Sequence, residues 1–351
     1  MFISLFLTLL ERNGSFMLEV LRINLCSPIS LAFVLGLFAR IIRSELSLPR
    51  ELYASLSIYL LLALGLKGGV ELSHASMAEL AWPAVVTLLL GVITPCTAYL
   101  VLRRIGRFSI ADSAGIAAHY GSVSAVTFIA AQQFVQTLGF PAEGFMPTLL
   151  TLLESPGIHV ALGIGAVQTA RLASQPRADG SPPVERRPLK EVLHEVLTAR
   201  SMILLVGGLA CGFVMGEKGY EPVKPFFEGM FKGALTLFLL EMGLAAGARL
   251  GDLKSTGLFL LAFGMIMPIL HGSLGVFLGH WAGLSIGGAT VLGAMAASAS
   301  YIAAPPAVRM TLPEANPTLY LTAALAITFP FNIVLGIPIY FQLARMLAGG
   351  S

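Results

Sequence analysis

The feature that most constrains this 351-residue chain is a succession of ten apolar runs, most of them about 20 residues long. A run of that length crosses the hydrocarbon core of a bilayer as an α-helix, because a helix rises about 1.5 Å per residue. The runs are continuous rather than alternating, which excludes a transmembrane β-barrel. Only 12% of the residues are charged, too few to cover a soluble domain of this size. We therefore predict an all-α polytopic protein embedded in a lipid bilayer.

The sequence predicts ten transmembrane helices arranged as two sets of five. The predicted spans are residues 27–43, 52–72, 79–102, 110–135, 146–170, 200–216, 230–250, 256–282, 286–310 and 318–347. A polar, proline-rich stretch, residues 173–199, separates the fifth span from the sixth. We expect a first five-helix repeat over residues 1–172, a cytoplasmic linker over 173–199 and a second repeat over 200–351.

Sequence similarity between the halves supports this division. The stretch 65–72 (GLKGGVEL) resembles 243–250 (GLAAGARL), and the same offset of 178 residues relates 115–125 to 293–303. Because each half has five spans, the second half must enter the membrane upside down relative to the first. This is the 5+5 inverted repeat of many secondary transporters.

The distribution of basic residues predicts the orientation. With the N-terminus outside, 15 of the 22 Lys and Arg residues fall on the inner side of the membrane. Positively charged loops favour the cytoplasm, so both termini are predicted to be external. The net charge of +3 gives no reason to expect a nucleic-acid partner.

Polar residues gather in the middle of the fourth and ninth spans, at Tyr120–Ser124 and at Ser298–Ile302. Pro305 and Pro306 follow the second stretch, and proline interrupts helices, so the ninth span should break at this pair. The fourth span has no proline, so Gly121 and its serines would have to permit a comparable bend there, for which the sequence signal is weaker. A broken helix exposes backbone N–H groups that attract anions, and serine hydroxyls can donate hydrogen bonds to them. The alternative is close helix packing, which also enriches small residues.

Two further residues are candidates for binding a cation or for gating. Thr127 follows the first polar stretch, and Glu154 precedes Ser155-Pro156, where the fifth span should also break. Carboxylates inside a membrane are functional candidates by default. Glu241 in the seventh span serves either such a role or a helix contact. The chain shows no nucleophile motif, phosphate-binding loop or zinc motif, and we predict that it is not an enzyme.

These stretches resemble the sodium-dependent bicarbonate transporter family, known best from cyanobacteria. The resemblance is carried by SPISLAFVLG in span one, LGLKGGVEL after span two, YGSVSAVTF in span four, PILHG in span eight and ASASYIAAPPAVRMTLPEANPTLYL from span nine into ten. It implies a homotrimer in the bacterial inner membrane, with periplasmic termini, that imports bicarbonate by sodium symport. It also implies discontinuous fourth and ninth helices, a core domain that moves against a gate domain, and a regulatory partner of the PII type.

The resemblance places the substrate between the two broken helices. The candidate substrate-binding residues are Tyr120, Gly121, Ser122, Val123, Ser124, Ser298, Ala299, Ser300 and Tyr301, and the candidate cation or gating residues are Thr127 and Glu154. Sodium is the expected coupling ion.

Departures from the family pattern leave other functions open. A family glycine is Ala125 here, a serine is Val126, and an aspartate in the second break is Tyr301. The site is thus more apolar than its relatives. One alternative is a transporter of the same fold for another small carboxylate or anion, coupled to protons through Glu154. A second is a membrane sensor or scaffold whose linker reports to a PII-like regulator.

Overall fold

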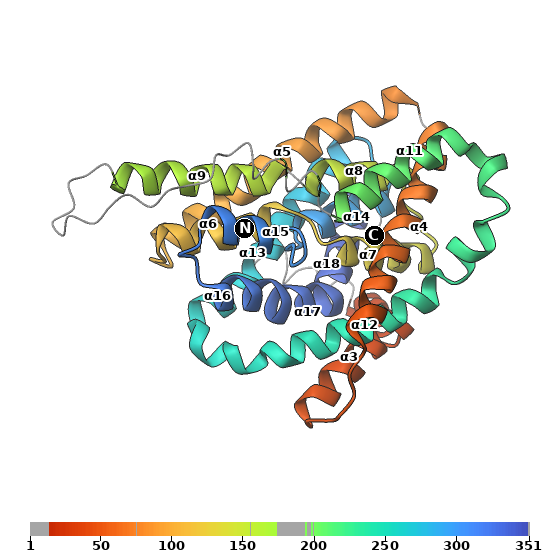
Figure 1. The fold of residues 1–351 in the computed structure, drawn as a ribbon. Helices are drawn as coiled ribbons and strands as arrows, with labels where there is room; N and C mark the ends of the chain where they lie inside the picture. Colours follow the sequence, from red (N-terminus) through yellow and green to blue (C-terminus); the bar gives the residue numbers. More distant parts are fainter. Residues whose placement is uncertain are drawn as a thin grey trace.

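The computed structural model describes residues 14–74, 76–154, 156–173, 194, 198 and 200–349. Within these ranges the chain is helical and contains no strand (Figure 1). The predicted linker, residues 173–199, and the first 13 residues therefore lie almost wholly outside the described part of the chain.

Within each half of the chain, the helices follow one another through short connections. The first half holds α2 (Gly14–Leu25), α3 (Pro28–Ile41), α4 (Arg50–His74), α5 (Met77–Arg104), α6 (Ile110–Gly121), α7 (Ala125–Thr137), α8 (Met146–Glu154) and α9 (Pro156–Ala173). The second half holds α11 (Arg200–Tyr220), η1 (Pro225–Gly229), α12 (Phe231–Arg249), η2 (Leu250–Asp252), α13 (Leu253–Trp281), α14 (Ile286–Ala296), α15 (Ala304–Thr311), α16 (Pro317–Leu321), η3 (Thr322–Thr328), α17 (Phe329–Phe331), η4 (Asn332–Gly336) and α18 (Ile337–Leu347). Of these, η1, η3 and η4 are π-helical and η2 is a 3₁₀ turn.

The helices have the length and composition of membrane spans. Among the described residues, eight helical segments are long and apolar enough to cross a bilayer, and two shorter apolar helices, Pro28–Ile41 and Ile286–Ala296, accompany them. Many of their apolar side chains face outward, such as Leu35 and Phe277, each 55% exposed. A lipid environment accounts for this apolar exterior, and the prediction of a polytopic α-helical membrane protein is confirmed.

Four helices form one group, called here the four-helix group: α3, α4, α11 and α12. The most extensive contacts between helices lie between α4 and α11 and between α3 and α12. Glycines allow the backbones to meet, since a Cβ on Gly65 would lie 2.9 Å from the Cα of Gly208. Likewise, a Cβ on Gly36 would lie 2.1 Å from the carbonyl oxygen of Leu240. Such small-residue contacts are the usual way in which membrane helices associate closely.

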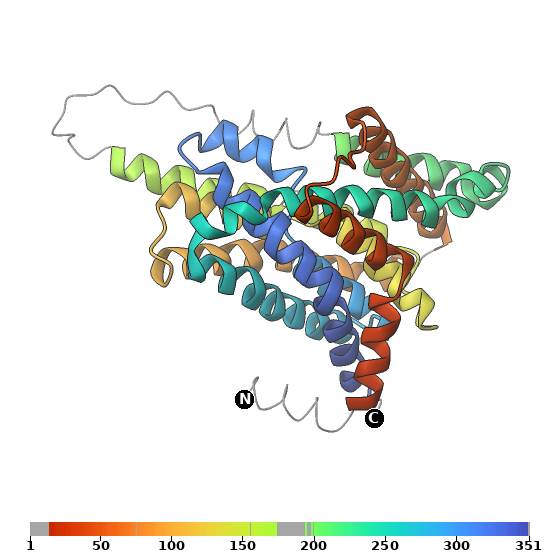
Figure 2. The same cartoon turned by 90° about the horizontal axis from the view of Figure 1, so that it is seen from below.

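The remaining helices, α5–α9 and α13–α18, form what we call the crossing group. Its centre is the segment 110–137, whose most apolar part is 94% buried, compared with 50% or less in α4, α5 and α11. Helix α6 packs mainly against α5 and α9, and α14 packs mainly against α13, α18 and α7. Figure 2 gives the view of the bundle from below. The two groups share one hydrophobic core, in which Phe33 of α3 packs against Phe329 of α17 with 5.5 Å between the ring centroids.

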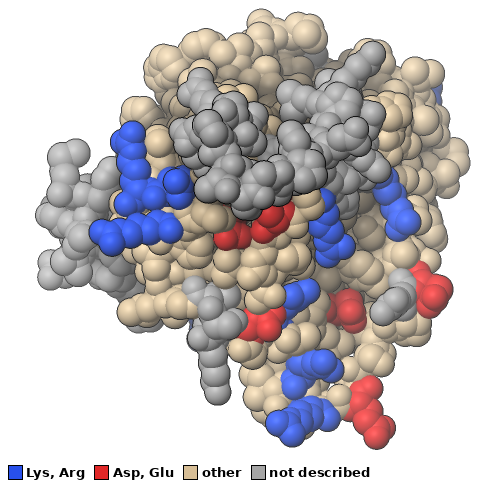
Figure 3. All heavy atoms as spheres, turned by 60° about the vertical axis from the view of Figure 1, so that its left-hand side comes forward, with Lys and Arg blue, Asp and Glu red and all other residues tan. Residues whose placement is uncertain are grey.

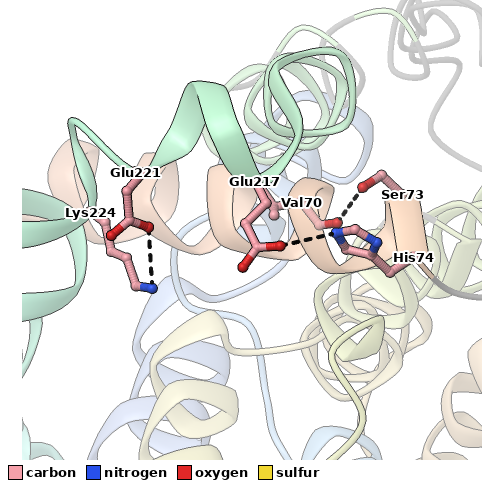
Figure 4. Close-up of polar contacts among 6 residues, drawn as sticks. All are labelled: Val70, Ser73, His74, Glu217, Glu221 and Lys224. Carbon is pink, nitrogen blue, oxygen red and sulfur yellow. Dashed lines mark hydrogen bonds and ion pairs between the residues drawn. The ribbon is translucent and has the colours of Figure 1, made fainter.

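The two ends of the bundle carry different polar features. The end that the charge distribution predicts to be external, called the outer face, holds the ends of α4, α7 and α11 and the start of α12. There Glu217 points to His74 at 4.0 Å and Glu221 to Lys224 at 3.5 Å (Figure 4). Trp82 and Trp281 meet at 4.9 Å and are exposed, as expected for aromatic residues at a membrane interface. Figure 3 shows another face of the molecule, on which Lys and Arg are spread from the left to the right and bottom of the view with Asp and Glu among them.

Candidate functional site

The fourth span is broken in its middle. Helix α6 ends at Gly121 and α7 begins at Ala125, with the intervening residues in extended conformation. Ser124 caps the second helix, because its Oγ accepts a hydrogen bond from the N–H of Thr127 at 3.3 Å. Serine is a favoured residue at this position, since its short side chain reaches the free N–H groups of the first turn. The break falls within the polar stretch from which it was predicted.

The ninth span is also broken, but not where the prolines lie. Helix α14 ends at Ala296 and α15 begins at Ala304, so the break precedes Pro305 and Pro306. The expectation of a break at the proline pair is corrected by one turn. Proline is tolerated in the first turn of a helix, where its missing N–H would have no intrahelical partner anyway. The prolines therefore start the second half-helix.

The two breaks meet in space. The N–H of Ser300 donates to the carbonyl oxygen of His119 at 2.8 Å, and the N–H of Ser124 donates to Oγ of Ser298 at 2.8 Å. The predicted stretches Tyr120–Ser124 and Ser298–Tyr301 are thus brought together. All nine of these residues are buried except Tyr301, which is partly buried. Polar groups from segments more than 170 residues apart in the sequence converge on one point.

The four serines at the breaks differ in what they can still bind. Ser122 donates its hydroxyl to the carbonyl oxygen of Glu154 at 2.8 Å, and Ser298 donates to that of Met295 at 2.8 Å. The hydroxyls of Ser124 and Ser300 act as acceptors from backbone N–H groups. A serine hydroxyl has one hydrogen to donate, so Ser300 retains that donor for a ligand, whereas the Ser124 hydroxyl has the phenol of Tyr301 beside it.

Three buried polar atoms around the crossing have no hydrogen-bond partner among the described residues. They are Oγ1 of Thr127, the phenol oxygen of Tyr301 and Nε2 of His119. The phenol of Tyr301 lies beside Ser124, and its ring meets that of Phe329 edge-on at 5.6 Å. A buried polar atom without a partner costs about 1–3 kcal/mol, so such atoms are rare unless a ligand satisfies them. Together with the first-turn N–H groups of α7, they present mostly donors to the space between the helices.

Glu154 lies at the same place. It ends α8, it is buried, and its carbonyl oxygen accepts the hydrogen bond from Ser122. Ser155, where a further break was predicted, lies outside the described residues, and α9 begins at Pro156. Thr127 and Glu154 therefore both lie next to the crossing, and their role as cation or gating residues stays a prediction.

The tenth span contributes polar residues that sequence reasoning did not single out. Asn332 donates from Nδ2 to the carbonyl oxygen of Ala297 at 2.9 Å, inside the second break. The hydroxyls of Tyr120 and Thr328 lie 2.5 Å apart. Both contacts come from or beside the π-helical segments η3 and η4, and such segments are frequent at functional sites. The signal that the sequence offered for Asn332 is a polar side chain inside an otherwise apolar run.

The backbone at the first break is packed too closely for larger residues. A Cβ on Gly157 of α9 would lie 1.8 Å from the carbonyl oxygen of Gly121. A Cβ on Gly121 would in turn lie 2.7 Å from the ring of Pro95. Glycine at both positions lets α9 and α5 hold the end of α6 in place.

Chemically, this site suits a small anion better than a reaction. Its donors are hydroxyls and backbone N–H groups, which bind oxyanions. Among the described residues, no group of three or more His, Cys, Asp and Glu side chains is arranged to hold a metal ion.

Comparison with known proteins agrees with this chemistry. A family model described as the Na+-dependent bicarbonate transporter superfamily matches residues 28–345, which include both breaks. No curated protein sequence matches the chain at a significant level.

Proposed function

Since the chain belongs to the Na+-dependent bicarbonate transporter superfamily, and is therefore a transporter rather than an enzyme, we propose that it imports bicarbonate together with sodium. The carrying observation is the meeting of the two breaks, where the N–H of Ser124 reaches Ser298. Around this contact, Ser300 and Tyr301 offer hydrogen-bond donors at the centre of the bundle. Bicarbonate has three oxygens that accept such bonds.

Sodium would bind beside the anion, at Thr127 and Glu154. Hard cations prefer oxygen ligands, and Thr127 has a buried hydroxyl oxygen without a partner among the described residues. Glu154 supplies a buried carboxylate next to the same break. A cation at this place would also offset the negative charge of the substrate in a water-poor environment.

The two halves of the chain are proposed to be inverted repeats of five helices. Two pairs of contacts support this arrangement. Exchanging equivalent helices between the halves converts the contact of α3 with α12 into that of α11 with α4. It also converts the contact of α5 with α6 into that of α13 with α14.

Hydrogen bonds at the ends of the broken spans come in pairs that support the same proposal. Ser109 caps α6 and Ser285 caps α14, each accepting from an N–H three residues ahead. Oδ1 of Asp112 accepts from the N–H of Asn316 at 2.8 Å, and Oε1 of Glu143 accepts from that of Ser285 at 2.6 Å. Each broken span is thus tied at its start to the loop that follows the other.

The proposed setting is a homotrimer in a bacterial inner membrane, with both termini in the periplasm. The resemblance supports it, and so does the bias of Lys and Arg toward one side. Reporter fusions at residue 351 and within 173–199 should lie on opposite sides of the membrane. Cross-linking in native membranes should give a species of three chains. A PII-like regulator, if it binds, is proposed to contact the linker.

The decisive experiment is uptake of labelled bicarbonate into proteoliposomes, with an inward sodium gradient, with equal sodium on both sides, and with sodium replaced by potassium. We expect uptake that follows the sodium gradient. Uptake that is independent of sodium would exclude sodium symport, and an absence of uptake would exclude bicarbonate as the substrate.

The same assay yields the stoichiometry. One bicarbonate carried with one sodium moves no net charge, so the membrane potential would contribute nothing to uptake. A tenfold sodium gradient then supplies only about 1.4 kcal/mol, enough for about tenfold accumulation. Greater accumulation, dependent on potential, would require more than one sodium per anion, because each extra charge is worth about 2.3 kcal/mol per 100 mV.

A second candidate substrate is another small carboxylate, such as formate or acetate. The observation in its favour is the apolar surface around the second break, where Tyr301 packs on Phe329 and Ala303 and Ala304 are buried. Competition of these acids with labelled bicarbonate tests this candidate. A pH gradient in place of sodium tests coupling to protons.

A further inference from the structure

In the described part of the chain, five helices are each followed by a residue whose backbone lies in the left-handed region. They are α3, α5, α7, α13 and α18, and the φ values of these residues lie between 55° and 84°. The left-handed residue lets an N–H group after the helix reach back to the last turn. After α3 the N–H of Ser44 donates to the carbonyl oxygen of Ala39 at 2.9 Å. Glycine is the usual residue here, because it has no Cβ to meet the following carbonyl oxygen.

Which residue takes this position depends on the end of the bundle. At the outer face it is glycine, in Gly139, Gly283 and Gly349. At the opposite end, called here the inner end, α3 and α5 are followed by Arg43 and Arg107, whose φ values are 59° and 55°. No other described residue apart from glycine has a positive φ. A side chain strains the backbone in this region, so the two arginines occupy positions where glycine would be less strained.

The same sequence pattern surrounds both arginines. Residues 40–43 read RIIR and residues 104–107 read RIGR, so each helix ends in the order Arg-Ile-x-Arg. All four arginines are exposed, and the isoleucines between them, Ile41 and Ile105, are 57% and 68% exposed. We call these two segments the arginine caps. One cap ends a helix of the four-helix group and the other ends a helix of the crossing group.

The arginines of the caps have no charged partner among the described residues. No described carboxylate lies within 4.0 Å of any of them, although Glu45 follows Arg43 by only two residues. A cation at the end of a helix interacts favourably with the helix dipole, but Arg40 and Arg104 already supply that charge in the last turns of α3 and α5. Ion pairing and the helix dipole therefore do not explain why Arg43 and Arg107 occupy strained positions.

Apolar side chains are exposed beside both caps. Ile42 in the first cap is 57% exposed. Leu258, which is 81% exposed, lies beside the second cap, because its neighbour Phe259 packs on Phe108 with 5.8 Å between the ring centroids. Exposed apolar side chains next to arginines are typical of the boundary between the acyl chains and the headgroups of a bilayer. The caps therefore suit a ligand that is itself a lipid.

The charge of the caps selects among lipids. A guanidinium group forms two parallel hydrogen bonds with phosphate oxygens. The phosphate of phosphatidylcholine is neutralised by its own choline cation, whereas phosphatidylglycerol keeps a net negative charge, and basic residues next to a membrane attract anionic lipids. We propose that each arginine cap binds the phosphate of one anionic phospholipid in the inner leaflet, with the isoleucine of the cap against its acyl chains. The choice of leaflet rests on the predicted orientation, and the proposal is independent of which ion is transported.

Lipid binding to the purified protein tests the proposal. In native mass spectrometry, the wild type should bind two phosphatidylglycerol molecules per chain about fivefold more tightly than phosphatidylcholine. Arg43→Gly and Arg107→Gly should each remove one of these two molecules, and the double variant should bind the two lipids alike. Arg22→Ala is the matched control, because Arg22 is an exposed arginine in the last turn of α2, before the chain enters α3 from the outer face. Equal binding of both lipids by the wild type, or the same loss in Arg22→Ala, would overturn the proposal.

Two further measurements separate lipid binding from other roles of the arginines. Without added lipid, Arg43→Gly and Arg107→Gly should melt at or above the temperature of the wild type, because glycine relieves the left-handed strain. A lower melting temperature of both variants would show that the arginines stabilise the fold, and would overturn the proposal. An excess of inorganic phosphate should leave phosphatidylglycerol bound, since free phosphate has no acyl chains. Displacement of the lipid would make the caps sites for a soluble phosphate instead. None of these measurements involves transport, so a failure of bicarbonate uptake would overturn the proposed function alone.

Discussion

Adding one methyl group at Gly157 should disturb the first break more than any change to its serines. The Cβ would lie 1.8 Å from the carbonyl oxygen of Gly121, 2.2 Å from its carbon and 2.6 Å from its Cα. Non-bonded heavy atoms prefer about 3.5–4.0 Å, so α9 would have to move away by more than about 1 Å. All three contacts are with backbone, and no change of rotamer can relieve them.

The expected cost follows from the contacts that would be lost. Overpacking in a close-packed interior costs about 1–3 kcal/mol, and the backbone clash places this variant at the upper end. A shift of α9 and of the end of α8 would also stretch the hydrogen bond from Ser122 to Glu154, worth about 1 kcal/mol. At about 2 °C per kcal/mol, the melting temperature should fall by roughly 6–8 °C. Uptake should be lost, because the break itself changes shape.

Gly163→Ala is the matched control, since Gly163 lies on the same helix and a Cβ there would meet nothing within 4 Å. Alanine favours a helix over glycine by up to about 1 kcal/mol, so this control should be as stable as the wild type or slightly more so. Thermal unfolding of both purified variants and uptake in proteoliposomes make the comparison. If Gly157→Ala melts within 1 °C of Gly163→Ala and transports normally, the close approach of α9 to α6 is wrong.

Three further substitutions separate structure from binding. Ser298→Ala leaves the buried N–H of Ser124 without its acceptor and should cost about 1–3 kcal/mol in thermal unfolding; unchanged stability would mean that the two breaks do not touch. Thr127→Val removes a hydroxyl that has no described partner, so stability should hold within about 0.5 kcal/mol while the apparent sodium affinity falls; unchanged sodium dependence would leave Thr127 a packing residue. Asn332→Leu should destabilise by about 1–3 kcal/mol through the orphaned carbonyl of Ala297 and should slow uptake, and full uptake would show that the tenth span does not support the site.

Much of the fold could be predicted because the structure of a segment inside a bilayer depends mainly on the residues of that segment itself. A run of about 20 apolar residues must be helical in hydrocarbon, whatever its neighbours. The same rule located the breaks, since Tyr120–Ser124 and Ser298–Tyr301 are polar where an uninterrupted helix would be apolar. The break in the ninth span was predicted at the proline pair itself, because proline disrupts the helical turn before it. Proline is favourable in the first turn of a helix, and the pair starts α15 after the break. The 5+5 repeat and the roles of the site residues stay predictions.

Other features depended on which segments meet. Nothing local to Ser122 and Ser300 shows that the first hydroxyl donates to the carbonyl oxygen of Glu154 while the second accepts from the N–H of Ala303. The hydrogen bond from Asn332 to Ala297 and the clash that a methyl group at Gly157 would make with Gly121 likewise involve residues that are distant in the sequence.

The sequence by itself determined that this protein lies in a lipid bilayer, which segments are helical, and where two of the spans are interrupted. These features depend on the transfer of each segment into hydrocarbon. The tertiary structure decided which polar groups remain free to bind a ligand. A hydrogen-bond donor is free for a ligand only if no acceptor of the protein lies close to it. At the crossing the acceptor comes from the other half of the chain, since Oγ of Ser298 accepts from the N–H of Ser124.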